Sequence, residues 1–265
     1  MRTTKVVALV LCFTVGGCSD SAAPRREVVM LPAAELVYEG FPAGTSELLR
    51  LAADGAAPAR LLPAGTLAMD PAASPDGRRI AFVVASYDSA TGDIWLVNAD
   101  GSGLRRLTDD PELDDSPAWS PDGRKIVFRS YRSLRDGELW TLDVESGALA
   151  NLTPAQGTAV IDHRRPAWSP DGRAIAFRRS NAAQGSDIVI VPADGGDAVR
   201  LALPGEQRTP AWHPDGTRIA FASQTTPLAR PELFTIRPDG SGAERVTRED
   251  DWGGGLNPAW RRTDR

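Results

Sequence analysis

The chain has 265 residues, of which 42% are hydrophobic and 25% are charged, and its formal net charge is −5. An acidic body does not favour nucleic acid or anionic lipid surfaces as partners. The 25 glycines and 21 prolines supply many turns, and no long segment shows a 3.6-residue apolar stripe. The composition therefore predicts an all-β protein with almost no helix in its folded body.

The first residues are typical of a bacterial export signal. Two basic residues precede the apolar run Val6–Val15, which has about half the length of a membrane helix. Two glycines and Cys18 follow, and this ending resembles the acylation motif of bacterial lipoproteins. Cys12 lies inside the signal, so Cys18 would be the only thiol of the exported protein. We expect residues 1–17 to be a lipoprotein signal peptide and Cys18 to carry the lipid, the alternative being an ordinary secretory signal.

The segment after the signal, residues 18–34, is rich in Ser, Ala, Pro and Arg and reads as a tether. By analogy with bacterial lipoproteins, Ser19 beside the acylated cysteine favours the outer membrane of a Gram-negative envelope. The predicted location is the cell envelope, with the lipid-anchored body facing the periplasm or the surface.

The folded body is predicted to occupy residues 35–265 and begins with an incomplete unit. Three short segments, Glu35–Tyr38, Glu47–Leu51 and Ala59–Leu62, look like the second, third and fourth strands of a sheet. No recognisable opening strand precedes them.

Four complete repeats follow this fragment. Each opens with a proline-alanine pair, a strand, a Pro-Asp-Gly turn and a second apolar strand, and the units start at Pro71, Pro117, Pro166 and Pro210. The opening recurs at Pro258, and successive starts are 46, 49, 44 and 48 residues apart. Spacings of about 40 to 50 residues are those of four-stranded propeller blades.

The second strand of each repeat is apolar on both faces. In the unit that starts at Pro117, Ile126 and Phe128 fall on one face and Val127 on the other. Such a strand belongs inside a sheet that is covered on both sides. Third strands follow, bounded by Asp-Gly or Ser-Gly turns, at Asp93–Val97, Glu138–Leu142, Asp187–Val191 and Glu232–Ile236.

The two ends of the body can be combined into one blade. The opening fragment lacks a first strand, and Asn257–Arg261 is a first strand without the other three. Pairing them predicts a closed five-bladed propeller in which Trp260 helps to hold the ends together. The alternative is six blades, with Val28–Leu31 contributing to an additional one.

The repeated Pro-Ala-Trp-Ser-Pro-Asp-Gly units resemble the propeller repeats of TolB, the periplasmic protein of the Tol-Pal system. They are also similar to repeats in the propeller domains of prolyl-oligopeptidase-type enzymes. The resemblance covers about Glu35–Arg261 and implies a propeller that binds an envelope partner. The α/β domain that precedes the propeller in TolB has no counterpart here, and propellers host many unrelated functions.

Enzyme chemistry has little support in the sequence. There is no G-x-S-x-G elbow for a serine nucleophile, and the two histidines, His163 and His213, do not stand at metal-ligand spacing. His163 is expected in a solvated loop before a first strand. We expect a non-enzymatic protein without cofactor or metal.

Residues that recur in every blade are expected to be structural. One carboxylate occupies the same turn position in each unit, where it can accept turn hydrogen bonds: Asp76, Asp122, Asp171 and Asp215. Blade-packing tryptophans recur at Trp119, Trp168, Trp212 and Trp260.

Residues that break the repeat are the better candidates for function. The loops entering the first strands should meet at one mouth of the channel, where a rigid ring can present a binding site. The candidate partner-binding residues are Asp70, Asp115, His163, Arg165, Arg208 and Trp252. The expected partner of this monomeric protein is an envelope protein or a glycan.

The alternative function is that of a five-bladed glycosidase or another hydrolase. It would use carboxylates at the same mouth, drawn from Asp70, Asp115, Asp162 and Glu206. Glycoside hydrolysis needs two carboxyl groups about 5 to 9.5 Å apart across a sugar-sized cleft.

Overall fold

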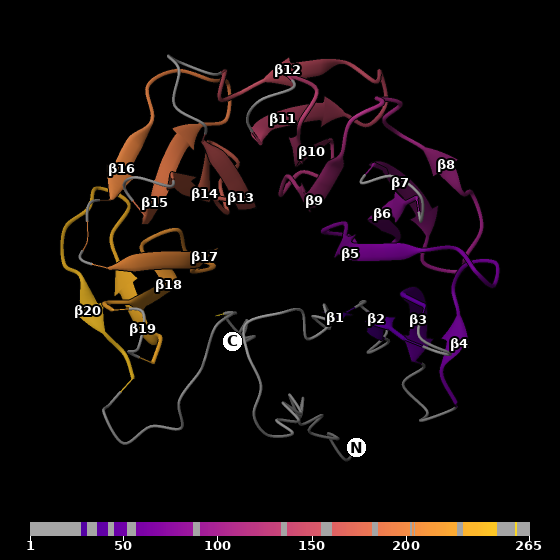
Figure 1. The fold of residues 1–265 in the computed structure, drawn as a ribbon, viewed down its shortest axis with the longest axis horizontal. Coiled ribbons are helices and arrows are strands. Elements are labelled where there is room, and N and C mark those ends of the chain that lie inside the picture. Colours follow the sequence, from indigo (N-terminus) through magenta and orange to yellow (C-terminus); the bar gives the residue numbers. More distant parts are fainter. Residues whose placement is uncertain are drawn as a thin grey trace, which may run out of the picture.

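A computed structural model of the chain describes residues 28–30, 36–41, 45–51, 57–86, 91–133, 137–154, 161–181, 185–201, 203, 205–226, 230–247 and 258. The described residues form five antiparallel sheets of four strands each, and they include no helix. Figure 1 shows the sheets arranged around a centre, with β5, β9, β13 and β17 nearest to it and β8, β12, β16 and β20 outermost. The fold is a five-bladed β-propeller, as the sequence predicts.

The first two blades contain the strands from Val28 to Arg106. Blade 1 consists of β1 (Val28–Met30), β2 (Leu36–Gly40), β3 (Glu47–Leu51) and β4 (Ala59–Arg60). Blade 2 consists of β5 (Ala68–Ala73), β6 (Arg79–Ala85), β7 (Gly92–Asn98) and β8 (Arg105–Arg106).

The remaining three blades repeat this order. Blade 3 consists of β9 (Asp114–Trp119), β10 (Lys125–Ser130), β11 (Glu138–Asp143) and β12 (Leu149–Asn151). Blade 4 consists of β13 (Asp162–Trp168), β14 (Ala174–Asn181), β15 (Gly185–Pro192) and β16 (Val199–Leu201). Blade 5 consists of β17 (Glu206–Trp212), β18 (Ile219–Gln224), β19 (Glu232–Ile236) and β20 (Glu244–Arg245).

The first strand of blade 1 corrects the sequence prediction. β1 (Val28–Met30) pairs with β2 and takes the place that was assigned to Asn257–Arg261. A strand that is adjacent in the chain closes a much shorter loop than one more than 200 residues away, so its pairing costs less entropy. Of the C-terminal segment only Pro258 is described, and Trp260 lies outside the described residues.

The core lies between the blades. Four phenylalanines occupy one equivalent position of the second strands and are fully buried: Phe82, Phe128, Phe177 and Phe221. They pack on the neighbouring sheet, because both faces of each second strand are apolar as the sequence predicts. Each such side chain contributes about 1.5 to 3 kcal/mol through burial.

Tryptophans of the first strands join neighbouring blades. The indole N–H groups of Trp119, Trp168 and Trp212 donate to backbone carbonyls of the preceding blade at 3.0 to 3.1 Å. Blade 2 has Ala73 at this position and cannot make the bond. Among the described strands each blade packs on the next in chain order, whereas blades 5 and 1 share no extensive contact.

Candidate functional site

The first strands of blades 2 to 5 share a bulge that faces the channel. In each, the residue before the proline has a positive φ, between 49° and 54°: Asp70, Ser116, Arg165 and Thr209. The ladder with the second strand changes register at the same place. Non-glycine residues in this conformation cost about 1 to 3 kcal/mol, and bulges re-aim side chains. At the inner edge of the ring these bulges bring Asp70 close to Ser116 and Arg165.

Asp70, on blade 2, interacts with residues of blades 1, 3 and 4 at this inner edge. Its carboxylate accepts a hydrogen bond from the Ser116 backbone N–H, and Arg165 and Asp115 lie close enough to interact electrostatically. Burial raises the pKa of Asp70, and the charge of Asp115 raises it further against the opposing effect of Arg165. Its own N–H donates to Glu39. Burial likewise raises the pKa of Glu39.

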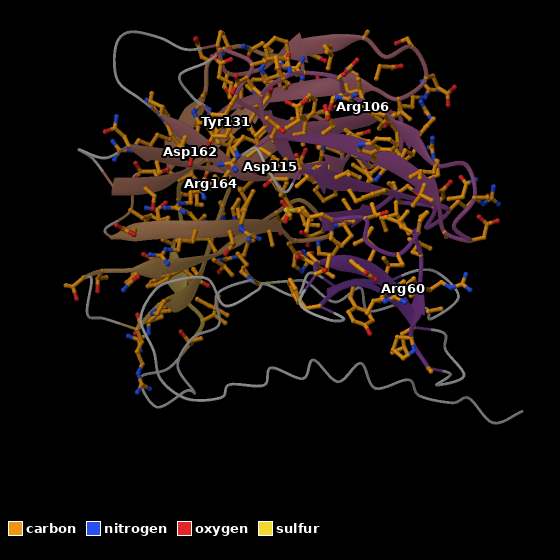
Figure 2. All side chains as sticks on the ribbon, turned by 45° about the vertical axis from the view of Figure 1, so that its right-hand side comes forward. Arg60, Arg106, Asp115, Tyr131, Asp162 and Arg164 are labelled. Carbon is orange, nitrogen blue, oxygen red and sulfur yellow. The ribbon has the colours of Figure 1, made fainter. Side chains whose placement is uncertain are left out.

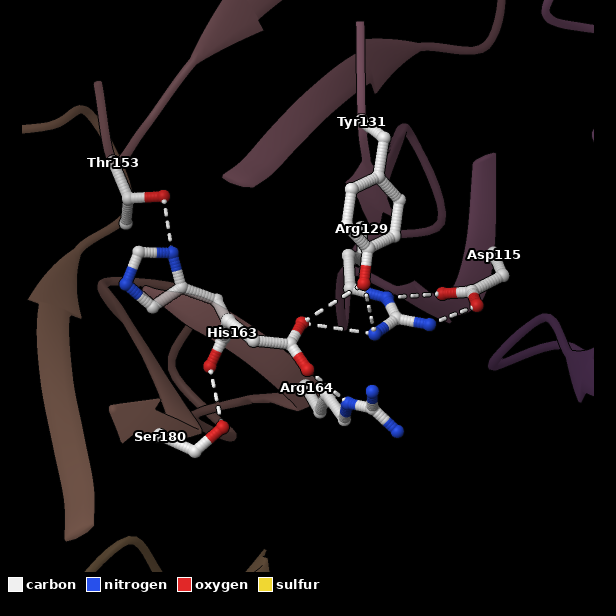
Figure 3. A network of polar contacts seen from close by, with 8 residues as sticks. Asp115, Arg129, Tyr131, Thr153, His163, Arg164 and Ser180 are labelled. Atoms are coloured by element: carbon white, nitrogen blue, oxygen red, sulfur yellow. Dashed lines mark hydrogen bonds and ion pairs between the residues drawn. The ribbon is translucent and has the colours of Figure 1, made fainter. Parts of the chain in front are cut away.

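A charged network centred on Arg129 crosses from blade 3 to blade 4 (Figure 3). The Arg129 Nε donates to Asp115 Oδ1 at 2.7 Å, and Nη2 contacts the other oxygen of the same carboxylate. Its Nη1 donates to Asp162 Oδ1 at 2.9 Å and to the Tyr131 hydroxyl at 3.0 Å. Asp162 is also paired with Arg164. Figure 2 shows the labelled members of this network close to one another and apart from Arg60 and Arg106.

The network holds its charges in ionised form. Burial alone would lower the pKa of Arg129, but hydrogen bonds and charges from Asp115 and Asp162 outweigh it and raise the pKa. Burial would raise the pKa of Asp162, yet Arg129 and Arg164 together hold it below its usual value. Because these two carboxylates are bound to one guanidinium, Arg129 fixes their positions.

His163 does not lie where the sequence placed it. It belongs to β13, and its side chain is buried, packing edge-on against Phe177 with 5.0 Å between ring centroids. Its Nδ1 is 3.1 Å from the Thr153 hydroxyl. The expectation of a solvated loop was wrong, because alternation along β13 turns this residue away from Asp162 and Arg164 towards the core.

The remaining predicted site residues are only partly brought together. Arg165 lies at the bulge beside Asp70. Arg208 lies on β17, and its Nη2 donates to Glu206 at 3.0 Å and to Gln224 at 3.2 Å. Trp252 and Cys18 lie outside the described residues.

Sequence reasoning missed the part of the site that lies on the second strands. The residue after each buried phenylalanine stands opposite a first-strand residue, and these positions are Val83, Arg129, Arg178 and Ala222. A signal was present, since two arginines interrupt an otherwise apolar position. Their partners come from other strands and blades, which the local pattern cannot show.

The repeated turn carboxylates accept hydrogen bonds from residues of their own turns. Asp76, Asp122 and Asp171 each accept from a serine hydroxyl two residues earlier and from a backbone N–H two residues later. Asp215 instead accepts from the backbone and hydroxyl of Thr217. Their hydrogen bonds stabilise the hairpins far along the strands from the charged network.

Within the described ranges, no three His, Cys, Asp or Glu side chains gather where they could hold a metal ion. The same part of the chain contains no helix with the length and apolar character that crossing a membrane requires. The described site is thus a set of arginine, carboxylate and tyrosine side chains on a rigid ring.

Comparison with known proteins agrees with this class of fold. The family described as the TolB beta propeller domain matches residues 34–161. A search of curated proteins found no match. Over residues 34–161 the chain is similar to the TolB beta propeller domain, and its described fold is a five-bladed β-propeller.

Solved structures show the same architecture. A putative TolB from Agrobacterium tumefaciens has a TM-score of 0.67 at 22% identity, covering 83% of this chain and 79% of that one. TolB from Acinetobacter baumannii has a TM-score of 0.68 at 20% identity, and the match covers 84% of this chain and 55% of that one. A puromycin hydrolase has a TM-score of 0.68 at 20% identity, over 86% of this chain and 38% of that one. At these identities the likeness shows the fold alone.

Proposed function

We propose that the protein is a non-enzymatic, lipid-anchored component of the bacterial envelope that binds a protein or glycan partner at the channel mouth. The observation that carries the proposal is the group of charged residues at the inner edge that depart from the repeat, in which Arg129 joins Asp115 to Asp162 and Asp70 interacts with Arg165. Arg129 holds Asp115 and Asp162 with 2.7 and 2.9 Å hydrogen bonds, so this group of charges is pre-organised. Rigid charged groups bind a complementary partner at a lower entropic cost than mobile ones do.

The likeness to TolB supports an envelope location, and the sequence around Cys18 supports a lipid anchor. Metabolic labelling with an alkyne-bearing palmitate tests the anchor. Wild-type protein should incorporate the label and a Cys18→Ser variant should not. Equal labelling of both proteins would exclude acylation at Cys18.

A pull-down from envelope extract tests the binding function. The mouth variant carries Arg165→Ala, Arg208→Ala and Trp252→Ala, and the control carries Arg124→Ala and Arg173→Ala at exposed turn positions. We expect the wild type and the control to retain the same partner and the mouth variant to lose it. Identical partner lists for all three proteins would show that the mouth has no part in binding.

The second candidate function is glycoside hydrolysis or related hydrolase chemistry. One observation favours it: Asp70 has a raised pKa and lies near Asp115, which is paired with Arg129. Two carboxyl groups in different environments are the usual arrangement of a general acid and its partner. Hydrolysis of a panel of chromogenic glycosides, abolished in Asp70→Asn, would establish this function instead of binding.

A further inference from the structure

Two arginines at equivalent positions of blades 3 and 4 have very different surroundings. Arg129 on β10 stands opposite Asp115 in the ladder, and Arg178 on β14 stands opposite Arg164. Residues directly opposite each other in an antiparallel pair lie on the same face, where like charges are destabilising. In blade 3 a carboxylate of the same sheet therefore balances the charge of Arg129. In blade 4 the residue opposite Arg178 is another cation.

Arg178 lacks the acceptors that Arg129 has. Its Nε is buried and has no hydrogen-bond partner among the described residues. Arg129, by contrast, uses Nε and both Nη atoms on Asp115 and Asp162. An N–H group that is buried without an acceptor destabilises the folded state, and such groups are rare in native proteins.

A second guanidinium with the same defect lies beside it. Arg208 is on β17, which packs on β14, and its Nε is also buried without a partner in the described part of the chain. Burial lowers the pKa of Arg178, and the charges of Arg208 and Arg164 lower it further. Two orphaned donors and three mutually repelling cations thus occupy one region between blades 4 and 5.

The local charge indicates which anion would fit. The charges of two carboxylates, Glu206 and Asp162, also interact with Arg178 and oppose the lowering of its pKa. Three guanidinium groups and two carboxylates leave one net positive charge, which matches a monoanionic carboxylate better than a dianionic phosphate. Guanidinium groups bind carboxylates through two parallel hydrogen bonds.

The neighbouring backbone favours a peptide as the source of that carboxylate. β17 is the edge strand of its sheet and pairs only with β18 in the sheet order. An edge strand offers backbone N–H and C=O groups with which an extended peptide can pair, whereas a glycan lacks the matching backbone.

We propose that Arg178 and Arg208 form a binding site for an acidic side chain of a peptide that enters the channel between blades 4 and 5. This inference rests on the proposed binding function and identifies the chemical class of the partner. The ligand carboxylate would accept hydrogen bonds from Arg178, as the Asp115 carboxylate does from Arg129.

Fluorescence anisotropy with fluorescein-labelled hexaglutamate tests the site, with labelled hexaglutamine as the neutral probe at the same ionic strength. We expect hexaglutamate to bind the wild type and Arg178→Gln or Arg208→Gln to weaken it at least tenfold, as for loss of a charge-assisted hydrogen bond. Arg173→Gln, at an exposed turn of the same blade, is the matched control and should bind as the wild type does. Equal affinity of the wild type and Arg178→Gln, or equal binding of both peptides, would overturn the inference.

Competition separates the carboxylate sources. Unlabelled hexaglutamate should displace the probe at lower concentration than inorganic phosphate or trigalacturonate does. Displacement by either competitor at an equal or lower concentration would refute an acidic peptide as the ligand.

A second variant tests the site without removing Arg178 or Arg208. Arg164→Asp places a carboxylate opposite Arg178, as Asp115 stands opposite Arg129. It should abolish hexaglutamate binding, and unchanged affinity in a folded Arg164→Asp variant would contradict the proposal. Suppose that the mouth variant loses its partner in the pull-down while Arg178→Gln keeps its affinity for hexaglutamate. That result would refute the carboxylate-binding site and leave the proposed binding function standing.

Discussion

Replacing Arg129 by methionine tests whether the charged network is a fixed part of the structure. The side chains of Arg129 and Asp115 are 8% and 12% exposed, so the change leaves Asp115 as a largely buried carboxylate without its cation. Asp162 keeps Arg164 and is affected less. Removing one partner of a buried ion pair costs about 3 to 5 kcal/mol.

The pH dependence of this loss has a definite sign. In the wild type the pKa of Asp162 lies below its usual value, so its stabilisation is present at neutral pH and is lost as pH falls through that pKa. In Arg129→Met, Asp162 loses one of the two cations that hold its pKa low, so this part of the stabilisation is absent at every pH. The difference in unfolding free energy between the two proteins should therefore be largest near pH 7 and should shrink towards pH 3.

Urea unfolding followed by tryptophan fluorescence at pH 7 and pH 3.5 measures this difference. The double variant Arg129→Met, Asp115→Leu removes both charges and should recover much of the stability, whereas Arg173→Met at an exposed turn should change it by less than about 0.5 kcal/mol. A loss below about 1 kcal/mol for Arg129→Met at pH 7, or one that does not depend on pH, would refute a pre-organised network.

Three further predictions concern the blades. Phe177→Ala should lower the unfolding free energy by about 3 to 5 kcal/mol, because Phe177 is 1% exposed between blades, and a loss under about 1 kcal/mol in urea unfolding would contradict that packing. Arg132→Met should cost about 3 to 5 kcal/mol, since its Nη2 lies 2.9 Å from fully buried Asp114; wild-type stability at pH 7 would argue against this ion pair. Hydrogen bonds from Thr217 lower the pKa of Asp215 to about 2. NMR titration of the Asp215 carboxyl should find that pKa in the wild type and a higher pKa in Thr217→Val. An unshifted pKa of Asp215 in the wild type would rule out this turn geometry.

The sequence was sufficient to predict the repeating part of the molecule. The Pro-Asp-Gly turns and second strands such as Ile126 to Phe128 depend on local backbone preferences and on alternation within one strand. These forces act between residues close in the chain, so the period and the apolar faces predict four-stranded blades directly. The same reasoning placed the second to fourth strands of blade 1 correctly.

Tertiary structure decided which residues meet at the centre of the ring. Arg129 and Arg178 follow equivalent phenylalanines, yet one is held by Asp115 and Asp162 and the other faces Arg164. Their partners lie on different strands and in one case on another blade, so electrostatic surroundings cannot be read from a single repeat. The same holds for β1, which fills the first place of blade 1 because pairing with an adjacent segment costs less loop entropy than recruiting the far end of the chain.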